Sequence, residues 1–284
     1  MYDFGIIGGD IRQMYITEYL AKAGYSVFCY GVENNIRDTA KNIDEVLRKT
    51  DVIIAPFPFS KDGKNVFLKN SYKRIANEEF ANMIPEGKIV FSGAVKNDIR
   101  RIIEKKGGKC IDVLANEKIK FYNSVSTAEG TIAEAVMGNG MMLYKSKILI
   151  AGYGMCGRIL AEKLKNLGAD VTICARRNEV RIQASECGFK VLGFDRLCNK
   201  ISEFEYIFNT VPAIVFDDDI VKKVKKTALF IDIASMPGGI EKESVRRNEI
   251  NYRHCQGLPG KYSPAVMARL YVENILDFID DMKK

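Results

Sequence analysis

Length, composition and charge exclude several classes of protein. The chain has 284 residues, of which 47% are hydrophobic and 28% charged, so it can form two folded domains and is not expected to be disordered. A net charge of +7 is typical of a mildly basic enzyme surface, and attraction of anionic ligands is the alternative interpretation. No basic block is interleaved with aromatic residues, so we expect no nucleic-acid partner. Seven scattered cysteines without a Cys-x-x-Cys pair indicate neither a disulfide framework nor a metal site. No signal peptide and no membrane span is recognisable, which predicts a soluble, cytoplasmic protein.

The first part of the chain alternates short β-branched runs with helical stretches. Because strands that alternate with helices form parallel sheets, the pattern predicts a doubly wound α/β domain. Strands are expected at 4–7, 26–30, 51–54, 88–91 and 109–113, and helices at 11–24 and 43–47.

A glycine turn separates the first strand from the first helix. It reads Gly8-Gly9-Asp10-Ile11-Arg12 and lacks the third glycine of a dinucleotide-binding fingerprint. One interpretation is a carboxylate-binding corner, in which Asp10 and Arg12 lie at the substrate and the helix N-terminus assists. In the other interpretation, Asp10 caps the helix and forms an ion pair with Arg12. The sequence leaves both open.

A long helix is expected from 126 to 142, between two α/β series, and we expect it to join the two domains. Ser126 or Thr127 can act as the N-cap, with Glu129 nearby. Capping alone is one interpretation of these three residues. In the other, the helix N-terminus meets an anionic substrate between the domains.

The second α/β series begins at residue 147 and predicts a second doubly wound, Rossmann-like domain. Its strands are expected at 147–151, 170–174, 206–209, 229–233 and 251–254, and helices at 155–167 and from 263 or 264 to about 281.

The first strand of this series leads into a Gly-x-Gly-x-x-Gly motif, and a helix with an apolar stripe follows. The glycines allow a tight turn, close approach of a pyrophosphate and close helix packing, while the helix N-terminus offers free N–H groups. With a strand before it and a helix after it, the motif predicts a dinucleotide site. The residues expected to contact the cofactor here are Gly152, Tyr153, Gly154, Met155, Cys156, Gly157 and Arg158.

The end of the next strand selects the cofactor. NAD-binding domains usually place a carboxylate there for the ribose hydroxyls. This chain instead has Arg176 and Arg177, and guanidinium groups suit a 2′-phosphate. The sequence therefore predicts NADP(H), with two solvated loop charges as the alternative interpretation.

Two further loops follow later strands and are expected to line the cofactor, because ligands bind at the carboxyl ends of strands in open α/β sheets. Ordinary turn chemistry is the alternative interpretation of both. The residues are Asn209, Thr210, Val211 and Pro212 in one loop, and Ile233, Ala234 and Ser235 in the other.

Two residues near the end of the second series are candidates for catalysis. His254 is the only histidine, and a lone histidine is more often structural than catalytic. Lys261 lies in a loop rich in glycine and proline, where it can face either a substrate or bulk water. The sequence assigns no catalytic residue beyond naming these two.

Five motifs together resemble the A subunits of bacterial dipicolinate synthase. They are Gly-Gly-Asp-x-Arg, Ser-Thr-Ala-Glu-Gly, Gly-Tyr-Gly-x-x-Gly-Arg, Ile-Asp-Ile-Ala-Ser-x-Pro-Gly-Gly and Gly-Leu-Pro-Gly-Lys-x-Ser-Pro, and they extend from Gly8 to Pro264. The resemblance implies two Rossmann-like domains with a cleft between them. A substrate domain would comprise 1–125 and a returning helix at 265–284, and an NADP-binding domain would comprise 126–264.

The resemblance also implies a reaction. Such enzymes of sporulation oxidise a dihydro- or hydroxytetrahydrodipicolinate to dipicolinate with NADP, together with a flavoprotein-like B subunit. A homo-oligomer is possible, and a dicarboxylate substrate would suit the basic charge. Two alternatives stay open: a D-2-hydroxyacid-type NAD(P) dehydrogenase, and a non-catalytic NADP-binding regulatory subunit.

Overall fold

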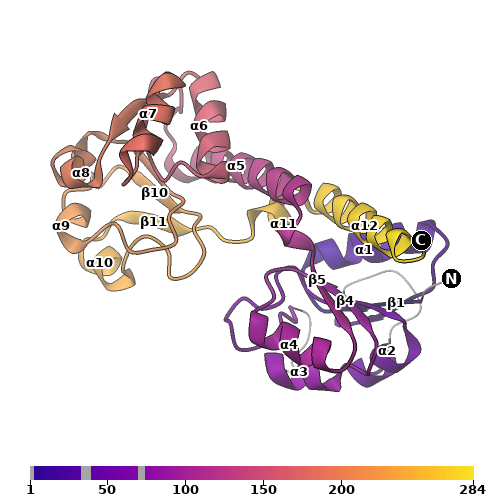
Figure 1. Ribbon diagram of the computed structural model, residues 1–284. Helices are drawn as coiled ribbons and strands as arrows, with labels where there is room; N and C mark the ends of the chain where they lie inside the picture. Colours follow the sequence, from indigo (N-terminus) through magenta and orange to yellow (C-terminus); the bar gives the residue numbers. More distant parts are fainter. Residues whose placement is uncertain (1–2, 33–39, 70–73) are drawn as a thin grey trace. The chain divides into compact units, whose positions relative to one another are not determined.

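The computed structural model describes residues 3–32, 40–69 and 74–284 (Figure 1). The chain forms two compact units. The first domain comprises Met1–Tyr122 and Ser263–Lys284, and the second domain comprises Asn123–Tyr262. Among the described residues, all pairs of neighbouring strands are parallel, in the order β2-β1-β3-β4-β5 in the first domain and β11-β10-β9-β6-β7-β8 in the second.

The first domain has a five-stranded sheet with helices on both faces. One face packs against α1 and the C-terminal helix α12, which lie side by side (Figure 1), and the other packs against α2, α3 and α4. Its strands are β1 (Phe4–Ile7), β2 (Val27–Tyr30), β3 (Val52–Ile54), β4 (Ile89–Ser92) and β5 (Lys109–Asp112). Its helices are α1 (Ile11–Lys22), α2 (Ile43–Lys49), α3 (Asn77–Met83), α4 (Asn97–Lys105), the 3-10 turn η1 (Val113–Ala115) and α12 (Pro264–Asp281).

The second domain has a six-stranded sheet in the Rossmann order. Helices α5 (Glu117–Asn139), α6 and α7 contribute to the apolar core on one face, and α8, α9 and α10 to the core on the other. Its strands are β6 (Lys147–Ala151), β7 (Asp170–Cys174), β8 (Lys190–Leu192), β9 (Tyr206–Asn209), β10 (Leu229–Asp232) and β11 (Asn251–His254). Its helices are α6 (Met155–Asn166), α7 (Asn178–Glu186), α8 (Phe194–Lys200), η2 (Ile201–Glu203), α9 (Asp218–Val221), α10 (Lys242–Arg247) and α11 (Leu258–Tyr262).

Both sheets confirm the predicted fold class. In each, the strand order reverses direction beside the first strand of the series, between β1 and β3 and between β6 and β9. Ligands of doubly wound domains bind at such switch points, at the carboxyl ends of the strands. The β1–α1 turn and the β6–α6 turn are therefore the two places where a site is to be sought.

The long helix α5 (Glu117–Asn139) begins earlier than the sequence predicts. Asn116 precedes it, and the Asn116 side chain accepts a hydrogen bond from the backbone N–H of Ile119 (3.2 Å), as an N-cap does. Ser126 and Thr127 therefore lie inside the helix, where the Thr127 hydroxyl donates to the carbonyl of Asn123 (2.7 Å). The prediction of a helix start at residue 126 was wrong because Ser and Thr can bond the preceding turn as well as cap it.

Candidate cofactor site

The β6–α6 turn is packed so closely that two of its glycines admit no side chain. Gly152 has a positive φ of 95°, and a Cβ there would lie 2.2 Å from the Thr210 hydroxyl oxygen. A Cβ on Gly157 would lie 2.5 Å from the carbonyl oxygen of Gly152. The first turn of α6 therefore sits directly on the end of β6, beside the loop that follows β9.

The middle glycine of the motif faces open space. Gly154 is the N-cap of α6 with an ordinary negative φ, and a Cβ there would meet nothing within 4 Å. Among the described residues, no acceptor is found for the N–H groups of Gly154, Met155 and Cys156. Unsatisfied N–H groups at a helix start beside free space fit the pyrophosphate of a dinucleotide.

The other side chains of the motif differ in what they could offer a ligand. Tyr153 is buried and packs edge-on against Phe189, and burial raises its pKa to about 12. Burial also raises the pKa of Cys156 to about 11, which keeps this thiol protonated at neutral pH. Arg158 is exposed in the first turn of α6.

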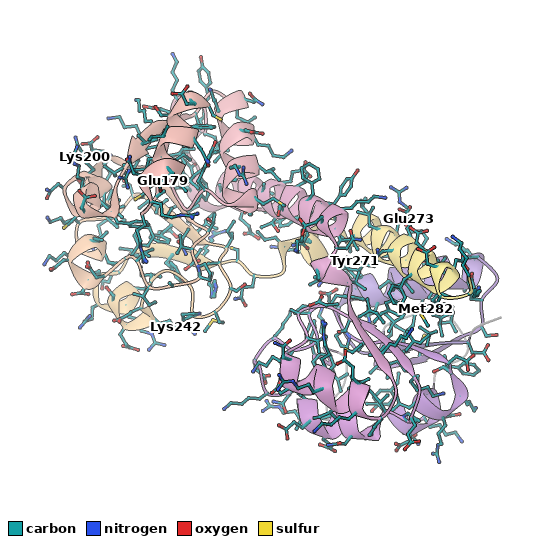
Figure 2. All side chains as sticks on the ribbon, viewed as in Figure 1. Glu179, Lys200, Lys242, Tyr271, Glu273 and Met282 are labelled. Atoms are coloured by element: carbon teal, nitrogen blue, oxygen red, sulfur yellow. The ribbon has the colours of Figure 1, made fainter. Side chains whose placement is uncertain are left out.

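Two exposed arginines follow β7. Arg176 and Arg177 come directly after this strand and its flanking Ala175, and Arg177 is the N-cap of α7. No hydrogen bond or ion pair of either guanidinium is found within the described parts of the chain. The first acidic residue after β7 is Glu179 in the first turn of α7 (Figure 2). The strand end thus presents two uncommitted cations and no carboxylate.

Arg181 supports this loop and was not singled out from the sequence. One terminal nitrogen of its guanidinium donates to the carbonyl oxygens of Ala175 and Arg176, both at 2.8 Å. The other donates to the Asn178 side-chain oxygen at 3.2 Å. An Arg shortly after an Arg-Arg pair at a strand end is the available sequence signal, but its target is backbone, which no residue pattern reveals.

The loop after β9 turns its polar side chains inward. Asn209 is fully buried, and its amide nitrogen donates to the Asp232 carboxylate (2.8 Å) and to the carbonyl of Val211 (3.0 Å). The Thr210 hydroxyl donates to the carbonyl of Ala151 (2.9 Å). Pro212 is exposed. The side chains of Asn209 and Thr210 therefore hold the loop in place, and the backbone and Pro212 remain for contact with a ligand.

The loop after β10 is built around a buried carboxylate. Asp232 is fully buried and accepts hydrogen bonds from the backbone N–H groups of Ala234 (3.0 Å) and Gly239 (2.7 Å) as well as from Asn209. Of the three residues predicted to line the cofactor here, Ile233 is partly buried, Ala234 is buried and Ser235 is exposed. Asp232 thus fixes the loop, a role that the sequence analysis missed although a buried strand ending in Asp before Gly-Gly was visible.

His254 lies at the carboxyl end of β11 beside this loop. Its Nε2 lies 3.0 Å from the carbonyl oxygen of Ala234, so the neutral ring carries its proton on Nε2 and leaves a lone pair on Nδ1. The neighbouring Tyr252 hydroxyl donates to Asp232 (3.4 Å), and burial together with that carboxylate raises the pKa of Tyr252. The contact of His254 is compatible with both interpretations left open by the sequence.

Lys261 is exposed, and it forms an ion pair with a carboxylate that is itself mostly buried. Its ammonium lies 2.5 Å from a carboxylate oxygen of Glu134 on α5, which also accepts from the Tyr262 hydroxyl (2.9 Å). Arg253 lies 3.4 Å from the other oxygen. The hydrogen bond from Lys261 is the main cause that holds the pKa of Glu134 below its ordinary value, and Glu134 in turn raises the pKa of Lys261.

In the first domain, the β1–α1 turn is filled by its own side chains. Asp10 caps α1 by accepting from the backbone N–H of Arg12 (3.1 Å), and the two side chains form an ion pair at 2.8 Å. Arg12 is 4% exposed and also donates to the hydroxyl of Tyr271 on α12 (3.1 Å; Figure 2) and to the carbonyl of Phe57. Of the two interpretations of this turn, the observed contacts are those of the cap and ion pair.

The three residues expected at the start of the long helix serve it in other ways. Ser126 is buried in α5, and its hydroxyl has no hydrogen-bond partner among the described residues. Thr127 bonds the preceding turn, as described above, and Glu129 forms an ion pair with Lys163 on α6 (2.8 Å). Because the helix starts at Glu117, the interpretation of a helix N-terminus that meets substrate at these residues was wrong.

The comparisons with known proteins agree with the two domains. The family model of the N-terminal domain of the dipicolinate synthase A subunit matches residues 3–114. The dipicolinate synthase A subunit of Bacillus subtilis (strain 168) is 24% identical over 277 residues, which are 95% of this chain and 93% of that protein. The resemblance to dipicolinate synthase A subunits is therefore confirmed. The crystal structure of the dipicolinate synthase A subunit from Bacillus halodurans has the same fold, with a TM-score of 0.83, 24% identity and coverage of 97% of each chain.

The second domain carries a similarity of its own. Residues 142–232 match the NADPH-binding domain of acetohydroxy acid isomeroreductase. An NAD-dependent formate dehydrogenase from Staphylococcus aureus, solved in complex with NAD, shares the fold at 15% identity, with a TM-score of 0.63 over 98% of this chain and 95% of that one. The second domain is therefore an NAD(P)-binding Rossmann domain.

Among the residues that the structure describes, no helix has the length and apolar character needed to cross a membrane. Within the same residues, no group of three or more His, Cys, Asp or Glu side chains is placed to hold a metal ion.

Proposed function

We propose that this protein is an NADP-dependent oxidoreductase that converts a dihydro- or hydroxytetrahydrodipicolinate to dipicolinate, working in sporulation with a flavoprotein-like B subunit. The observation that carries the cofactor assignment is the pair of exposed arginines after β7, Arg176 and Arg177, where no carboxylate stands. The similarity to dipicolinate synthase A subunits supports the substrate assignment.

The residues around the β6–α6 turn suit a dinucleotide phosphate. The open space at Gly154 and the free N–H groups of the first turn of α6 would receive the pyrophosphate. Arg176 and Arg177 would bind the 2′-phosphate, since guanidinium forms charge-assisted, bidentate hydrogen bonds to phosphate. When bound, NADP⁺ supplies a hydride acceptor at nicotinamide C4.

The reaction also needs a proton acceptor. A dihydro ring that loses one hydride and one proton becomes the aromatic pyridine, and a hydroxytetrahydro ring loses water in addition. Of the two candidates, Lys261 is held protonated by Glu134, because that ion pair raises its pKa. The Nε2 of His254 faces the Ala234 carbonyl oxygen, so the neutral ring has its lone pair on Nδ1. We therefore propose His254 as the group that accepts the proton from the substrate.

Cofactor choice is tested by a double substitution. Arg176→Ala with Arg177→Ala should weaken NADPH binding by about 10- to 100-fold and NADH binding by less than about 2-fold, since only NADPH carries the 2′-phosphate. Titration calorimetry measures both dissociation constants. Arg246→Ala on α10, which removes an exposed arginine paired with Glu243 (2.9 Å), is the matched control and should change neither. Equal losses for the two cofactors would contradict the 2′-phosphate assignment.

The reaction is tested by NADPH formation with a dihydrodipicolinate-type substrate, compared with simple 2-hydroxy acids. His254→Gln keeps a donor for the Ala234 carbonyl but no base, and turnover should fall by about 100-fold or more with cofactor binding unchanged. Gln256→Ala, which removes the other side chain near that carbonyl (3.4 Å), should retain turnover. Full turnover in the His254→Gln variant would show that His254 is not the proton acceptor. Oxidation of 2-hydroxy acids alone would favour the D-2-hydroxyacid dehydrogenase alternative, and NADPH binding that no dicarboxylate alters would favour a regulatory subunit.

A further inference from the structure

The guanidinium of Arg181 donates its hydrogen bonds to the loop that carries the two exposed arginines. It lies in α7, four residues after the N-cap Arg177, and its side chain reaches back over the first turn. The carbonyl oxygens that it bonds belong to Ala175 and Arg176, the two peptide groups that precede Arg176 and Arg177. Asn178, the first residue of α7, accepts the third hydrogen bond.

These bonds determine where the neighbouring side chains point. Each carbonyl belongs to a peptide plane, and a plane held at its oxygen has little freedom to rotate. The planes after Ala175 and Arg176 set the backbone dihedral angles on both sides of Arg176 and before Arg177. A guanidinium is a rigid planar fork, so one group can hold two oxygens in a defined relative position.

We propose that Arg181 is a positioning residue for cofactor selectivity, which acts by holding the loop 175–178 so that Arg176 and Arg177 converge on the 2′-phosphate. This inference rests on the proposed NADP specificity. Without Arg181, the two arginines keep their charges but have to be ordered when the cofactor binds, and that ordering lowers the affinity for the phosphate-bearing cofactor.

Two other roles for Arg181 predict different results. If it only adds positive charge near the phosphate, Arg181→Lys should preserve NADPH binding. If it only stabilises α7, its loss should lower the thermal midpoint and affect both cofactors equally. If it positions the loop, both Arg181→Lys and Arg181→Met should lower the ratio of NADPH to NADH affinity, because a lysine ammonium lacks the planar fork.

The test is a double-mutant cycle on the full chain, with dissociation constants for NADPH and NADH from titration calorimetry. The variants are Arg181→Met, Arg181→Lys, the Arg176→Ala/Arg177→Ala pair, and the pair combined with Arg181→Met; Arg246→Met is the matched control. Each Arg181 variant should weaken NADPH binding by about 5- to 10-fold and NADH binding by less than about 2-fold. In the combined variant the Arg181 effect should vanish, because the side chains it positions are gone.

The outcomes separate this inference from the proposed function. If the Arg176→Ala/Arg177→Ala variant keeps the parent chain's ratio of NADPH to NADH affinity, the NADP assignment fails and the inference fails with it. If the pair loses NADPH preference but neither Arg181 variant does, the inference alone is overturned. An Arg181 effect that persists in full in the combined variant also overturns it, because Arg181 would then act without the two arginines.

Discussion

The β1–α1 turn and the β6–α6 turn occupy the same place in their sheets but differ in what lies at the start of the following helix. In the first domain, Asp10 caps α1 and pairs with the buried Arg12, so the helix start is occupied by the protein itself. In the second, Gly154 leaves the start of α6 without a side-chain cap and next to open space. A Rossmann-like topology alone therefore does not make a dinucleotide site; the start of the helix must also be left free.

The charges near the two turns follow the same contrast. Arg12 donates to a carboxylate, a tyrosine hydroxyl and a carbonyl, which leaves it little capacity for an external anion. Arg176 and Arg177 have no such partners among the described residues. Removal of a buried arginine that the fold satisfies leaves its partners unpaired and destabilises the protein, whereas an exposed arginine without partners can be removed at little cost and is available to a ligand.

The largest effect that this contrast predicts is on stability. Arg12→Met leaves the Asp10 carboxylate and the Tyr271 hydroxyl without their partner, and the first domain should lose about 3–5 kcal/mol of unfolding free energy. NADPH binding by the second domain should not change. Because the chain has no tryptophan, far-UV circular dichroism during urea unfolding is a suitable probe, and NADPH binding can be followed separately.

The control for this variant is Arg269→Met on α12, which removes an exposed arginine 3.7 Å from Glu273 (Figure 2) and should cost at most about 1 kcal/mol. A well-folded Arg12→Met variant with a raised KM for the dicarboxylate would instead place Arg12 in the substrate site and break the contrast between the turns.

The next effect is on cofactor binding without any change in stability. Gly154→Ala introduces a methyl group into free space at a residue with negative φ, so the thermal midpoint should stay the same. The methyl group would occupy the space that we propose for the pyrophosphate, and NADPH binding should therefore weaken by about 100-fold, or about 2.7 kcal/mol. Both quantities come from thermal unfolding with and without NADPH.

Gly157→Ala changes a glycine of the same turn that has no room for a side chain. Its Cβ would lie 2.5 Å from the Gly152 carbonyl oxygen, so this variant should lose stability and cofactor binding together. If Gly154→Ala binds NADPH as the parent chain does, the open turn is not the cofactor site.

How much the sequence could predict depended on whether a feature is local. The β6–α6 turn, most strands and helix α12 follow from short patterns, because periodicity and glycine spacing act within a few residues. Helices α3 (77–83) and α4 (97–105) were not predicted, and their buried residues pack in a core that also includes residues of distant strands. Helix α5 was predicted with a late start because two hydroxyl residues in its interior resembled a cap.

The site residues divide in the same way. Gly154, Arg176 and Arg177 could be identified by motif and position. Glu134 could not, because its partners Arg253, Lys261 and Tyr262 lie 119, 127 and 128 residues further along the chain. A carboxylate in the middle of a helix has no local sign of such partners, and Lys261 was consequently interpreted without its counter-ion.

The smallest expected effect concerns Glu134 and its partners Arg253, Lys261 and Tyr262, which we call the Glu134 cluster. Like Asp10 in the first domain, Glu134 is a carboxylate whose partners belong to the protein itself. Because its partners hold the pKa of Glu134 below the ordinary 4.5, the cluster stabilises the fold fully above that pH and loses its contribution as pH falls through the lower, folded-state value. Glu134→Gln should lower the unfolding free energy by about 1–2 kcal/mol at pH 7. The same substitution should make the second domain less sensitive to acid below about pH 4.5.

Glu129→Gln on the same helix is the matched control, because its ion pair with Lys163 is exposed and worth at most about 1 kcal/mol. Urea unfolding at pH 7 and at a series of acidic pH values measures both variants. Equal pH dependence of Glu134→Gln and the parent chain would show that the cluster adds nothing to stability. In that case the ion pair would not be what determines the role of Lys261, and the interpretation of Lys261 as a cation that faces the substrate would be favoured.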